Sequence, residues 1–367
     1  MKNILHVFKT YFPDAPGGVQ EAIRAISLYT REYGFQHSVF TLSPDPVPQE
    51  VDFEGTLVHR ERQIAAPLSC PIGNWESLRA LRRMAENADI ILYHYPWPFG
   101  DLLSFCVHGK PSVVLYHSDI VKQKLSGALY APLRERFLNR ADVIVATSPN
   151  YAESSAILQE HKNKLKVIPL TAIPDDEPED PKIIDDLNLN LKPFVLFVGV
   201  LRYYKGLDTL IKAAKHVNCP VIIAGEGPER KHLQELQKET GAENIFFLGE
   251  ITNAQKKALY KRASVFAFPS NVRSEAFGIS LAEAAMYGLP MVSCEIGTGT
   301  SFINVDGVTG YVVPPNKSEL FGKAISNILE DSDSARRMAK SAISRWQSEM
   351  TPRKIGNMWT KLFNELC

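Results

Sequence analysis

The sequence predicts two α/β domains, each a doubly wound, Rossmann-like parallel sheet with helices on both faces. The chain has 367 residues, more than one hydrophobic core usually supports. Short apolar runs that fit buried strands alternate with amphipathic helical patterns in both halves. A stretch rich in proline and acidic residues separates the halves. We therefore expect domains at 1–172 and 194–350, with 173–193 as the linker.

The composition is that of an ordinary globular protein, with 45% hydrophobic and 22% charged residues. Lys+Arg and Asp+Glu both number 41, so no global basic charge points to nucleic acid. The five cysteines are scattered without metal-ligand spacing, which fits free thiols in a reducing cytoplasm. The first residues lack the apolar core of a signal peptide, and no apolar run is long enough to predict a transmembrane helix.

In the first half, apolar runs predict a series of strands and helices. Strands are expected at 4–8, 38–42, 56–59, 89–93, 111–116, 143–146 and 166–168. Helices are expected at 19–33, 75–86 and 130–139. Residues 43–74 are proline-rich and give no clear pattern beyond the strand at 56–59.

Polar and glycine residues follow several of these strands, where open parallel sheets bind ligands. Gly17-Gly18 fits either a plain tight turn or a close approach of the backbone to a phosphate or an acceptor. His94 lies beside Tyr-Pro-Trp-Pro, which suits stacking against an acceptor sugar, and Asp119 is a weaker acceptor-side candidate. The residues that share this edge are Gly17, Gly18, His94, His117, Asp119 and Ser148.

The first half also carries eight basic residues that allow two interpretations. They form ordinary solvated helix faces, or they form a patch that faces anionic lipid head groups at roughly 1 kcal/mol per charge. Enzymes that elongate lipid-linked glycans need the second kind of contact. The residues are Arg79, Arg82, Arg83, Lys122, Lys124, Arg134, Arg136 and Arg140.

The second half repeats the alternation. Strands are expected at 194–198, 221–224, 245–248, 265–268, 291–293 and 310–315. Helices are expected at 208–216, 278–288, 318–330, 333–346 and 352–366. Glycine-rich turns follow the strands, as expected for loops that approach a ligand closely.

Two of these turns carry specific chemistry. Arg202 and Lys205 follow the first strand and could neutralise a pyrophosphate that gains charge as it leaves. Gly225 opens a turn that is not a dinucleotide motif, because Arg230 replaces the third glycine. Gly249 and the segment 295–301 belong to further turns at the same edge.

The stretch 264–288 holds the strongest single signal. Phe277, Gly278 and Ile279 would offer the free N–H groups of a helix N-terminus to a phosphate. Glu283, one turn into that helix, could accept both hydroxyls of a ribose. Glu275, just before the helix, would reach past the phosphates to the group they carry. Two acids around a phosphate site indicate a nucleotide sugar.

Ser-Glu-Ala-Phe-Gly-Ile-Ser-Leu-Ala-Glu-Ala, residues 274–284, resembles the donor-site motif of retaining glycosyltransferases of the GT4 family. The resemblance covers nearly the whole chain and is most specific over 199–315. It implies the GT-B fold, with two Rossmann-like domains facing each other across a cleft, and a metal-independent enzyme without a cofactor. It also implies that the last helix, 352–367, packs back on the first domain.

The resemblance implies roles for individual residues. Glu275 would hold sugar hydroxyls, Glu283 would bind the ribose, and His117 would contact the transferred sugar from the opposite domain. The leaving pyrophosphate would be stabilised by Arg202, Lys205 and the helix N-terminus. The glycine turns beside the donor would be those at Gly17, Gly18, Gly225 and Gly249.

The donor and acceptor follow from a narrower resemblance. Residues 6–14 and 295–301 are similar to those of bacterial mannosyltransferases that build O-antigen, a lipopolysaccharide component. This implies GDP-mannose as donor, a lipid-linked saccharide as acceptor and possible peripheral contact with the inner face of the plasma membrane. A UDP-hexose donor, a GT-B-fold UDP-sugar epimerase and a nucleotide-sugar binding protein without turnover remain as alternatives.

Overall fold

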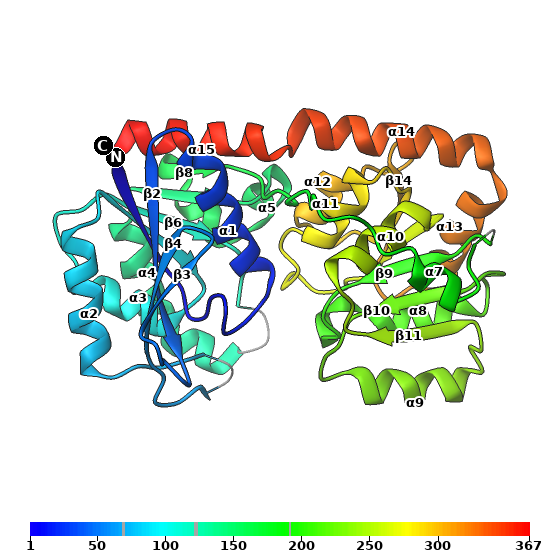
Figure 1. Cartoon of the computed structure of the whole chain (residues 1–367), viewed down its shortest axis with the longest axis horizontal. Coiled ribbons are helices and arrows are strands. Elements are labelled where there is room, and N and C mark those ends of the chain that lie inside the picture. Colours follow the sequence, from blue (N-terminus) through cyan, green and yellow to red (C-terminus); the bar gives the residue numbers. More distant parts are fainter. Residues whose placement is uncertain (68–69, 121–123, 191) are drawn as a thin grey trace. The chain divides into compact units, whose positions relative to one another are not determined.

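The computed structural model describes residues 1–67, 70–120, 124–190 and 192–367 (Figure 1). These residues form two compact units. The first comprises Met1–Thr171 and Pro352–Cys367, and the second comprises Ala172–Thr351. Each unit contains a sheet of mostly parallel strands with helices packed on it.

The described part of the first unit contains a sheet of eight strands in the order β3-β4-β2-β1-β5-β6-β7-β8. Neighbouring strands are parallel, except that β3 pairs antiparallel with β4 as a hairpin. Strand order therefore reverses at β1, which lies between β2 and β5. The strands are β1 Lys2–Val7, β2 Phe35–Ser43, β3 Glu50–Phe53, β4 Thr56–Arg62, β5 Ile90–Tyr95, β6 Ser112–Tyr116, β7 Val143–Ala146 and β8 Leu165–Val167.

The helices of the first unit include the last helix of the chain, α15. Gly356 of α15 lies against α1, where a Cβ would stand 2.3 Å from the Tyr29 carbonyl oxygen. Trp359 and Phe363 of the same helix are fully buried. The helices are α1 Gly18–Arg31, α2 Trp75–Glu86, α3 Pro98–Ser104, α4 Lys124–Arg140, α5 Pro149–Ser154, α6 Ala156–Glu160 and α15 Pro352–Leu366.

The described part of the second unit contains a sheet of six parallel strands in the order β11-β10-β9-β12-β13-β14. Strand order reverses between β9 and β12, which is the position where such sheets bind ligands. The strands are β9 Val195–Val198, β10 Val221–Ala224, β11 Ile245–Gly249, β12 Val265–Phe268, β13 Met291–Cys294 and β14 Gly310–Val313.

Helices cover this sheet and enclose a core of aliphatic and aromatic side chains that includes Val195, Phe197, Leu210 and Phe321. The helices are α7 Lys182–Asp186, α8 Leu207–Ala214, α9 Arg230–Thr240, α10 Asn253–Arg262, α11 Ile279–Met286, α12 Gly299–Ile303, α13 Ser318–Glu330 and α14 Ser332–Glu349. Among the described helices, none combines the length and the apolar character needed to span a bilayer.

The acidic segment expected as a linker packs on the second unit. Lys257 Nζ donates to the carbonyl oxygens of Asp175 at 2.6 Å and Glu177 at 2.7 Å. The Asp180 N–H donates to the Ala254 carbonyl oxygen at 3.0 Å. The basic helix α10 thus offsets the repulsion among the acids, and residues 172–190 belong to the second unit.

Candidate functional site

The loops after β9 and β12 are locked together at the carboxyl end of the second sheet. Gly206 has φ +63°, and a Cβ there would lie 2.2 Å from the Pro269 carbonyl oxygen. The Asn271 N–H donates to the Tyr204 carbonyl oxygen at 3.1 Å. These contacts bring the loop that carries Lys205 against the loop that carries Glu275.

Lys205 and Glu275 form an ion pair at this edge. Lys205 Nζ lies 2.5 Å from Glu275 Oε2, and both side chains are only 11% exposed. Ser270 Oγ donates to the same carboxylate oxygen at 3.4 Å, and the ammonium lies 5.0 Å from the centre of the Phe268 ring. Such a pair is held away from water, so removing either partner would leave an uncompensated charge.

Arg202 belongs to the same loop and is exposed. The Lys205 N–H donates to the Arg202 carbonyl oxygen at 2.9 Å, which closes a short 3-10 turn, Tyr203–Lys205. Within the described residues, no ion pair engages the Arg202 guanidinium. The turn therefore presents one paired cation and one cation open to an anion.

The N-terminus of α11 lies in the loop after β12. Gly278 has φ +93°, and a Cβ there would lie 3.0 Å from Cζ of the Phe268 ring. Among the described residues, no side chain caps this helix, so its first N–H groups, around Ile279, are available to a ligand. Phe277 is buried, and the Gly299 N–H donates to the Ala276 carbonyl oxygen at 2.8 Å. The loop after β13 thus supports this terminus.

Glu283, on α11, has two partners from α10. Lys256 Nζ lies 2.7 Å from Glu283 Oε1, and the Tyr260 hydroxyl donates to Oε2 at 2.9 Å. Burial, followed by the Glu283 charge, raises the pKa of Tyr260 well above its usual range. The carboxylate is therefore held in one orientation. We did not predict α10 from the sequence, and so missed Lys256 and Tyr260.

The glycines after β10 and β11 allow close backbone packing beside this site. Gly225 has φ +135°, and a Cβ there would lie 2.1 Å from the Gly199 carbonyl oxygen. The Gly225 N–H donates to the Gly249 carbonyl oxygen at 2.8 Å. Packing within the fold thus requires glycine at 225 whether or not a ligand is bound.

In the first unit, Gly17 and Gly18 mark the start of α1 after β1. Gly17 is the residue before the helix, and a Cβ there would lie 2.6 Å from Gln20 Oε1. Gln20 Nε2 donates to Thr10 Oγ1 at 2.9 Å. The absence of a side chain at Gly17 therefore lets Gln20 fold back on the loop after β1.

His117 and His94 lie at the carboxyl ends of β6 and β5 and contact each other. His94 Nδ1 and His117 Nε2 are 2.9 Å apart. His94 is 2% exposed, and its other nitrogen is bonded to His6, so its surroundings do not favour the expected acceptor contact. Burial lowers the pKa of His117 to about 3 and that of His94 well below its usual range.

Asp119 and Ser148 have local structural partners. Asp119 Oδ1 accepts hydrogen bonds from the Tyr116 hydroxyl at 2.9 Å and from Ser155 Oγ at 3.0 Å. Ser148 caps α5, since its Oγ accepts a hydrogen bond from the Tyr151 N–H at 3.1 Å. These contacts order the loops after β6 and β7. No group of three or more His, Cys, Asp and Glu in the described ranges is arranged to hold a metal ion.

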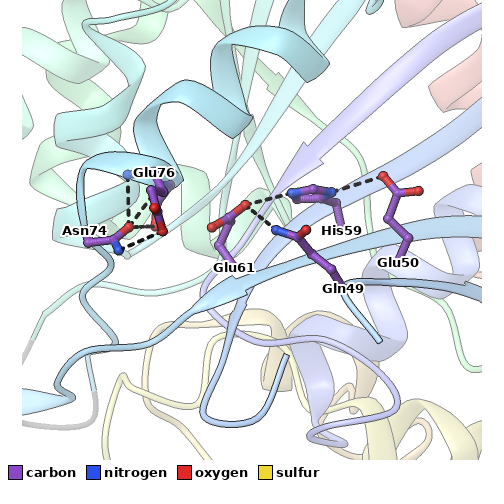
Figure 2. A network of polar contacts seen from close by, with 7 residues as sticks. Gln49, Glu50, His59, Glu61, Asn74 and Glu76 are labelled. Atoms are coloured by element: carbon purple, nitrogen blue, oxygen red, sulfur yellow. Dashed lines mark hydrogen bonds and ion pairs between the residues drawn. The ribbon is translucent and has the colours of Figure 1, made fainter. Parts of the chain in front are cut away.

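A second polar network, which we did not predict, joins β3 to β4. Figure 2 shows His59 between two carboxylates, with Nδ1 3.2 Å from Glu50 Oε1 and Nε2 2.9 Å from Glu61 Oε1. Gln49 Nε2 also donates to Glu61 Oε1 at 2.8 Å. These bonds satisfy the buried Glu61 and stabilise the edge hairpin.

The basic residues of α2 line an open pocket of about 680 Å³ next to this network, together with Glu61, Glu76 and Glu86. Trp75, at the start of α2, is 65% exposed, and the Arg79 guanidinium lies 5.8 Å from its ring centre. The three arginines there, Arg79, Arg82 and Arg83, are exposed. Of the other predicted basic residues, Arg140 is tied to the Val107 carbonyl oxygen, and Lys122 lies outside the described residues.

Comparison with known proteins identifies the family. The model for glycosyltransferase family 4 matches residues 16–171, and the model for glycosyl transferases group 1 matches residues 179–345. The D-rhamnosyltransferase WbpZ of Pseudomonas aeruginosa is 41% identical over 351 residues, 95% of this chain and 92% of its own. The chain belongs to glycosyltransferase family 4.

Two further comparisons extend this assignment. The O-antigen chain mannosyltransferase C of Escherichia coli is 38% identical over 365 residues, 99% of this chain and 98% of its own. A solved sucrose-phosphate synthase from Thermosynechococcus elongatus superposes with a TM-score of 0.83 at 22% identity, over 100% of this chain and 99% of its own. The predicted GT-B fold is confirmed, and this glycosyltransferase has two parallel-sheet α/β domains.

Proposed function

We propose that this glycosyltransferase moves a hexose from a nucleoside diphosphate sugar with retention of configuration. The observation that carries the proposal is the Lys205–Glu275 pair beside the uncapped N-terminus of α11. A cation, a carboxylate and free backbone N–H groups converge at the switch point of the second sheet. This set suits a pyrophosphate attached to a polyhydroxylated sugar.

Each group has a role in the proposed reaction. Arg202, Lys205 and the α11 N-terminus stabilise the charge that develops on the leaving pyrophosphate. Glu275 accepts hydrogen bonds from sugar hydroxyls, and Glu283, oriented by Tyr260, accepts those of the ribose. The acceptor hydroxyl attacks the face from which the diphosphate leaves, and a departing phosphate oxygen takes its proton. His117 contacts a hydroxyl of the transferred sugar.

For the donor sugar, we propose mannose carried by GDP. Two relatives support a sugar of this kind, since one is named for rhamnose and the other for mannose. D-Rhamnose is mannose without its 6-hydroxyl, so the two donors differ at one polar contact. A UDP-hexose is the alternative donor.

We further propose that the acceptor is a lipid-linked saccharide in O-antigen-like polysaccharide synthesis on the cytoplasmic side of the membrane. The name of the Escherichia coli relative supports this class of product. Trp75 beside Arg79 supports contact with anionic lipid, since aromatic and basic side chains favour the membrane interface. Sedimentation with anionic vesicles should decrease for Arg79→Glu and for Trp75→Ala, and equal sedimentation of all three proteins argues against the contact.

Thermal unfolding with GDP, UDP, ADP and their hexose conjugates tests the donor. A ligand at 100 times its dissociation constant stabilises a protein by about 2.7 kcal/mol, which gives a measurable shift in Tm. Stabilisation by GDP and GDP-mannose alone supports the mannosyltransferase. Stabilisation by UDP compounds instead indicates that the donor is a UDP-hexose. Release of an epimerised free sugar would indicate the epimerase, and binding without any product would indicate the binding protein.

A further inference from the structure

Four buried histidines of the first unit form one continuous hydrogen-bonded chain that begins at Thr30 of α1 and ends at His117. None of them is more than 6% exposed. The successive distances are Thr30 Oγ1 to His37 Nε2 2.7 Å, His37 Nδ1 to His6 Nε2 2.9 Å, His6 Nδ1 to His94 Nε2 3.0 Å, and His94 Nδ1 to His117 Nε2 2.9 Å.

The strand register explains why these side chains meet. His37 of β2 pairs with Ile4 of β1, and His6 lies two residues further along the same strand. The same two-residue step relates His6 to His94 of β5, through Leu92. It also relates His94 to His117 after β6, through Leu115. Because side chains two residues apart share a face of a strand, the histidines form a diagonal across one face of the sheet.

The direction of the chain follows from the hydroxyl at its start. Thr30 Oγ1 donates its single proton to the Ile26 carbonyl oxygen at 2.7 Å, so it can only accept from His37. His37 must then carry its proton on Nε2 and accept at Nδ1. The same assignment passes to each ring in turn, because a neutral imidazole donates through one nitrogen and accepts through the other.

We propose that this chain, anchored at Thr30, holds His117 with its proton on Nε2, so that its Nδ1 presents a hydrogen-bond acceptor to a hydroxyl of the transferred sugar. Thr30, His37, His6 and His94 are positioning residues that act through His117. The contact with the sugar rests on the proposed function, whereas the tautomer does not. Among the residues that the structure describes, none forms a hydrogen bond with His117 Nδ1.

Burial keeps the rings neutral, as the chain requires. A charged imidazole donates through both nitrogens and would break the sequence of donors and acceptors. Desolvation lowers the pKa of His6 to about 3 and that of His37 well below its usual range. Arg31, on the helix that carries Thr30, lowers the pKa of His37 further. Among the described residues, no carboxylate contributes to the shifts at His6, His37, His94 or His117.

Nitrogen-15 NMR of the full-length protein labelled at histidine tests the tautomer directly, because protonated and unprotonated ring nitrogens resonate far apart. His117→Gln assigns the signal of His117. We expect Nδ1 of His117 to be unprotonated in the wild type and in Thr30→Ser, which keeps the hydroxyl. Thr30→Val removes the anchor, so part of the His117 population should gain a proton on Nδ1.

A wild-type His117 protonated at Nδ1 would overturn the proposal, even if Thr30→Val fails to fold. An unchanged His117 tautomer in folded Thr30→Val would overturn the role of the anchor. When the nucleotide sugar that gives the largest thermal shift is added, the chemical shift of His117 Nδ1 should change, because this nitrogen accepts a hydrogen bond from a sugar hydroxyl. If the chemical shifts of other histidines change and that of His117 Nδ1 does not, the proposed contact with the sugar is overturned. The tautomer is read without ligand or turnover, so failure of the proposed function remains distinguishable from failure of the chain.

Discussion

Lys205 and Glu275 are 70 residues apart in sequence, yet their charged atoms lie 2.5 Å apart. The pair exists because β9 and β12 are neighbours in the sheet although β10 and β11 separate them in the chain. Each residue lies in the loop that follows its strand, and Gly206 lets the two loops touch. Before a donor binds, the pair satisfies two charges that would otherwise be buried alone.

Removing Glu275 should separate catalysis from nucleotide binding. We expect Glu275→Ala to lower kcat/KM by at least about 100-fold, as for other groups that stabilise a transition state. The dissociation constant of the nucleoside diphosphate should stay within about threefold, since this carboxylate is assigned to the sugar. Steady-state kinetics and calorimetry measure the two effects, and an equal loss of both contradicts the role.

Lys205→Ala should weaken both binding and turnover, because the ammonium is assigned to the pyrophosphate. Lys261→Ala is the matched control, since Lys261 pairs with Glu179 on the surface of the same unit at 3.2 Å. We expect the control to change kcat/KM by less than about twofold, as exposed pairs contribute little. Similar losses in the two variants would show that the effect of Lys205 is not local.

Glu283 should distinguish ribose from deoxyribose. Wild-type protein should bind the ribonucleoside diphosphate about tenfold more tightly than its 2′-deoxy form, which corresponds to roughly one hydrogen bond, about 1.4 kcal/mol. Glu283→Ala should abolish this preference, and Tyr260→Phe should reduce it. Calorimetric titration with both nucleotides measures the ratio. A preference that survives Glu283→Ala would place the ribose elsewhere.

The buried histidines should make the first unit sensitive to acid. His6 and His117 have pKa values of about 3 in the native state, against about 6.5 in the unfolded chain. Between these values the unfolded state binds more protons, so the free energy of unfolding falls as pH falls below 6.5. Well below pH 6.5, each such histidine should lower the free energy of unfolding by about 1.4 kcal/mol for every unit by which the pH falls.

Urea unfolding at pH 7.5, 6.5 and 5.5 measures this loss. His108 is exposed, and His108→Gln should keep the wild-type dependence on pH. His6→Phe should make this dependence on pH less steep by the share of one buried histidine, whatever its effect on absolute stability. If the free energy of unfolding of the wild type is constant from pH 7.5 to 5.5, this contradicts the proposal that the hydrogen-bonded histidines are held neutral.

Gly225 should be far less tolerant of substitution than Gly241. Both have positive φ, but a Cβ on Gly225 meets the Gly199 carbonyl oxygen at 2.1 Å, while among the described residues outside the local backbone none comes within 4 Å of a Cβ on Gly241. Gly241→Ala should therefore cost about 1–2 kcal/mol from backbone strain alone. Gly225→Ala adds a steric term of about 1–3 kcal/mol. Denaturant unfolding of the two variants measures the difference, and equal losses would argue against the close contact.

Apolar runs bounded by glycine or proline predicted most strands correctly. The expected strands 143–146, 221–224 and 265–268 agree with β7, β10 and β12, and the helix 75–86 agrees with α2. These segments bury every residue of a strand or one clear face of a helix, so their pattern is strong. Elements with little apolar character were missed. The helix α9 buries only Leu233, and the short strand β3 is a partly exposed edge strand.

The candidate site shows the same limit. Lys205, Glu275 and Glu283 could be predicted from local motifs, and the structure shows which of them meet. Their partners Ser270, Lys256 and Tyr260 have no motif of their own, since contact with a distant carboxylate defines them. The histidine chain depends on strand register across four strands, which single-strand patterns do not contain.

The last helix has a consequence for the order of events during synthesis. Ile355, Trp359, Leu362 and Phe363 of α15 are buried in the unit built from the first 171 residues. Because α15 follows the second unit in the chain, the unit translated first cannot bury these side chains until the second unit has been synthesised. The half of the protein that is translated first therefore completes its packing only after the other half has been made.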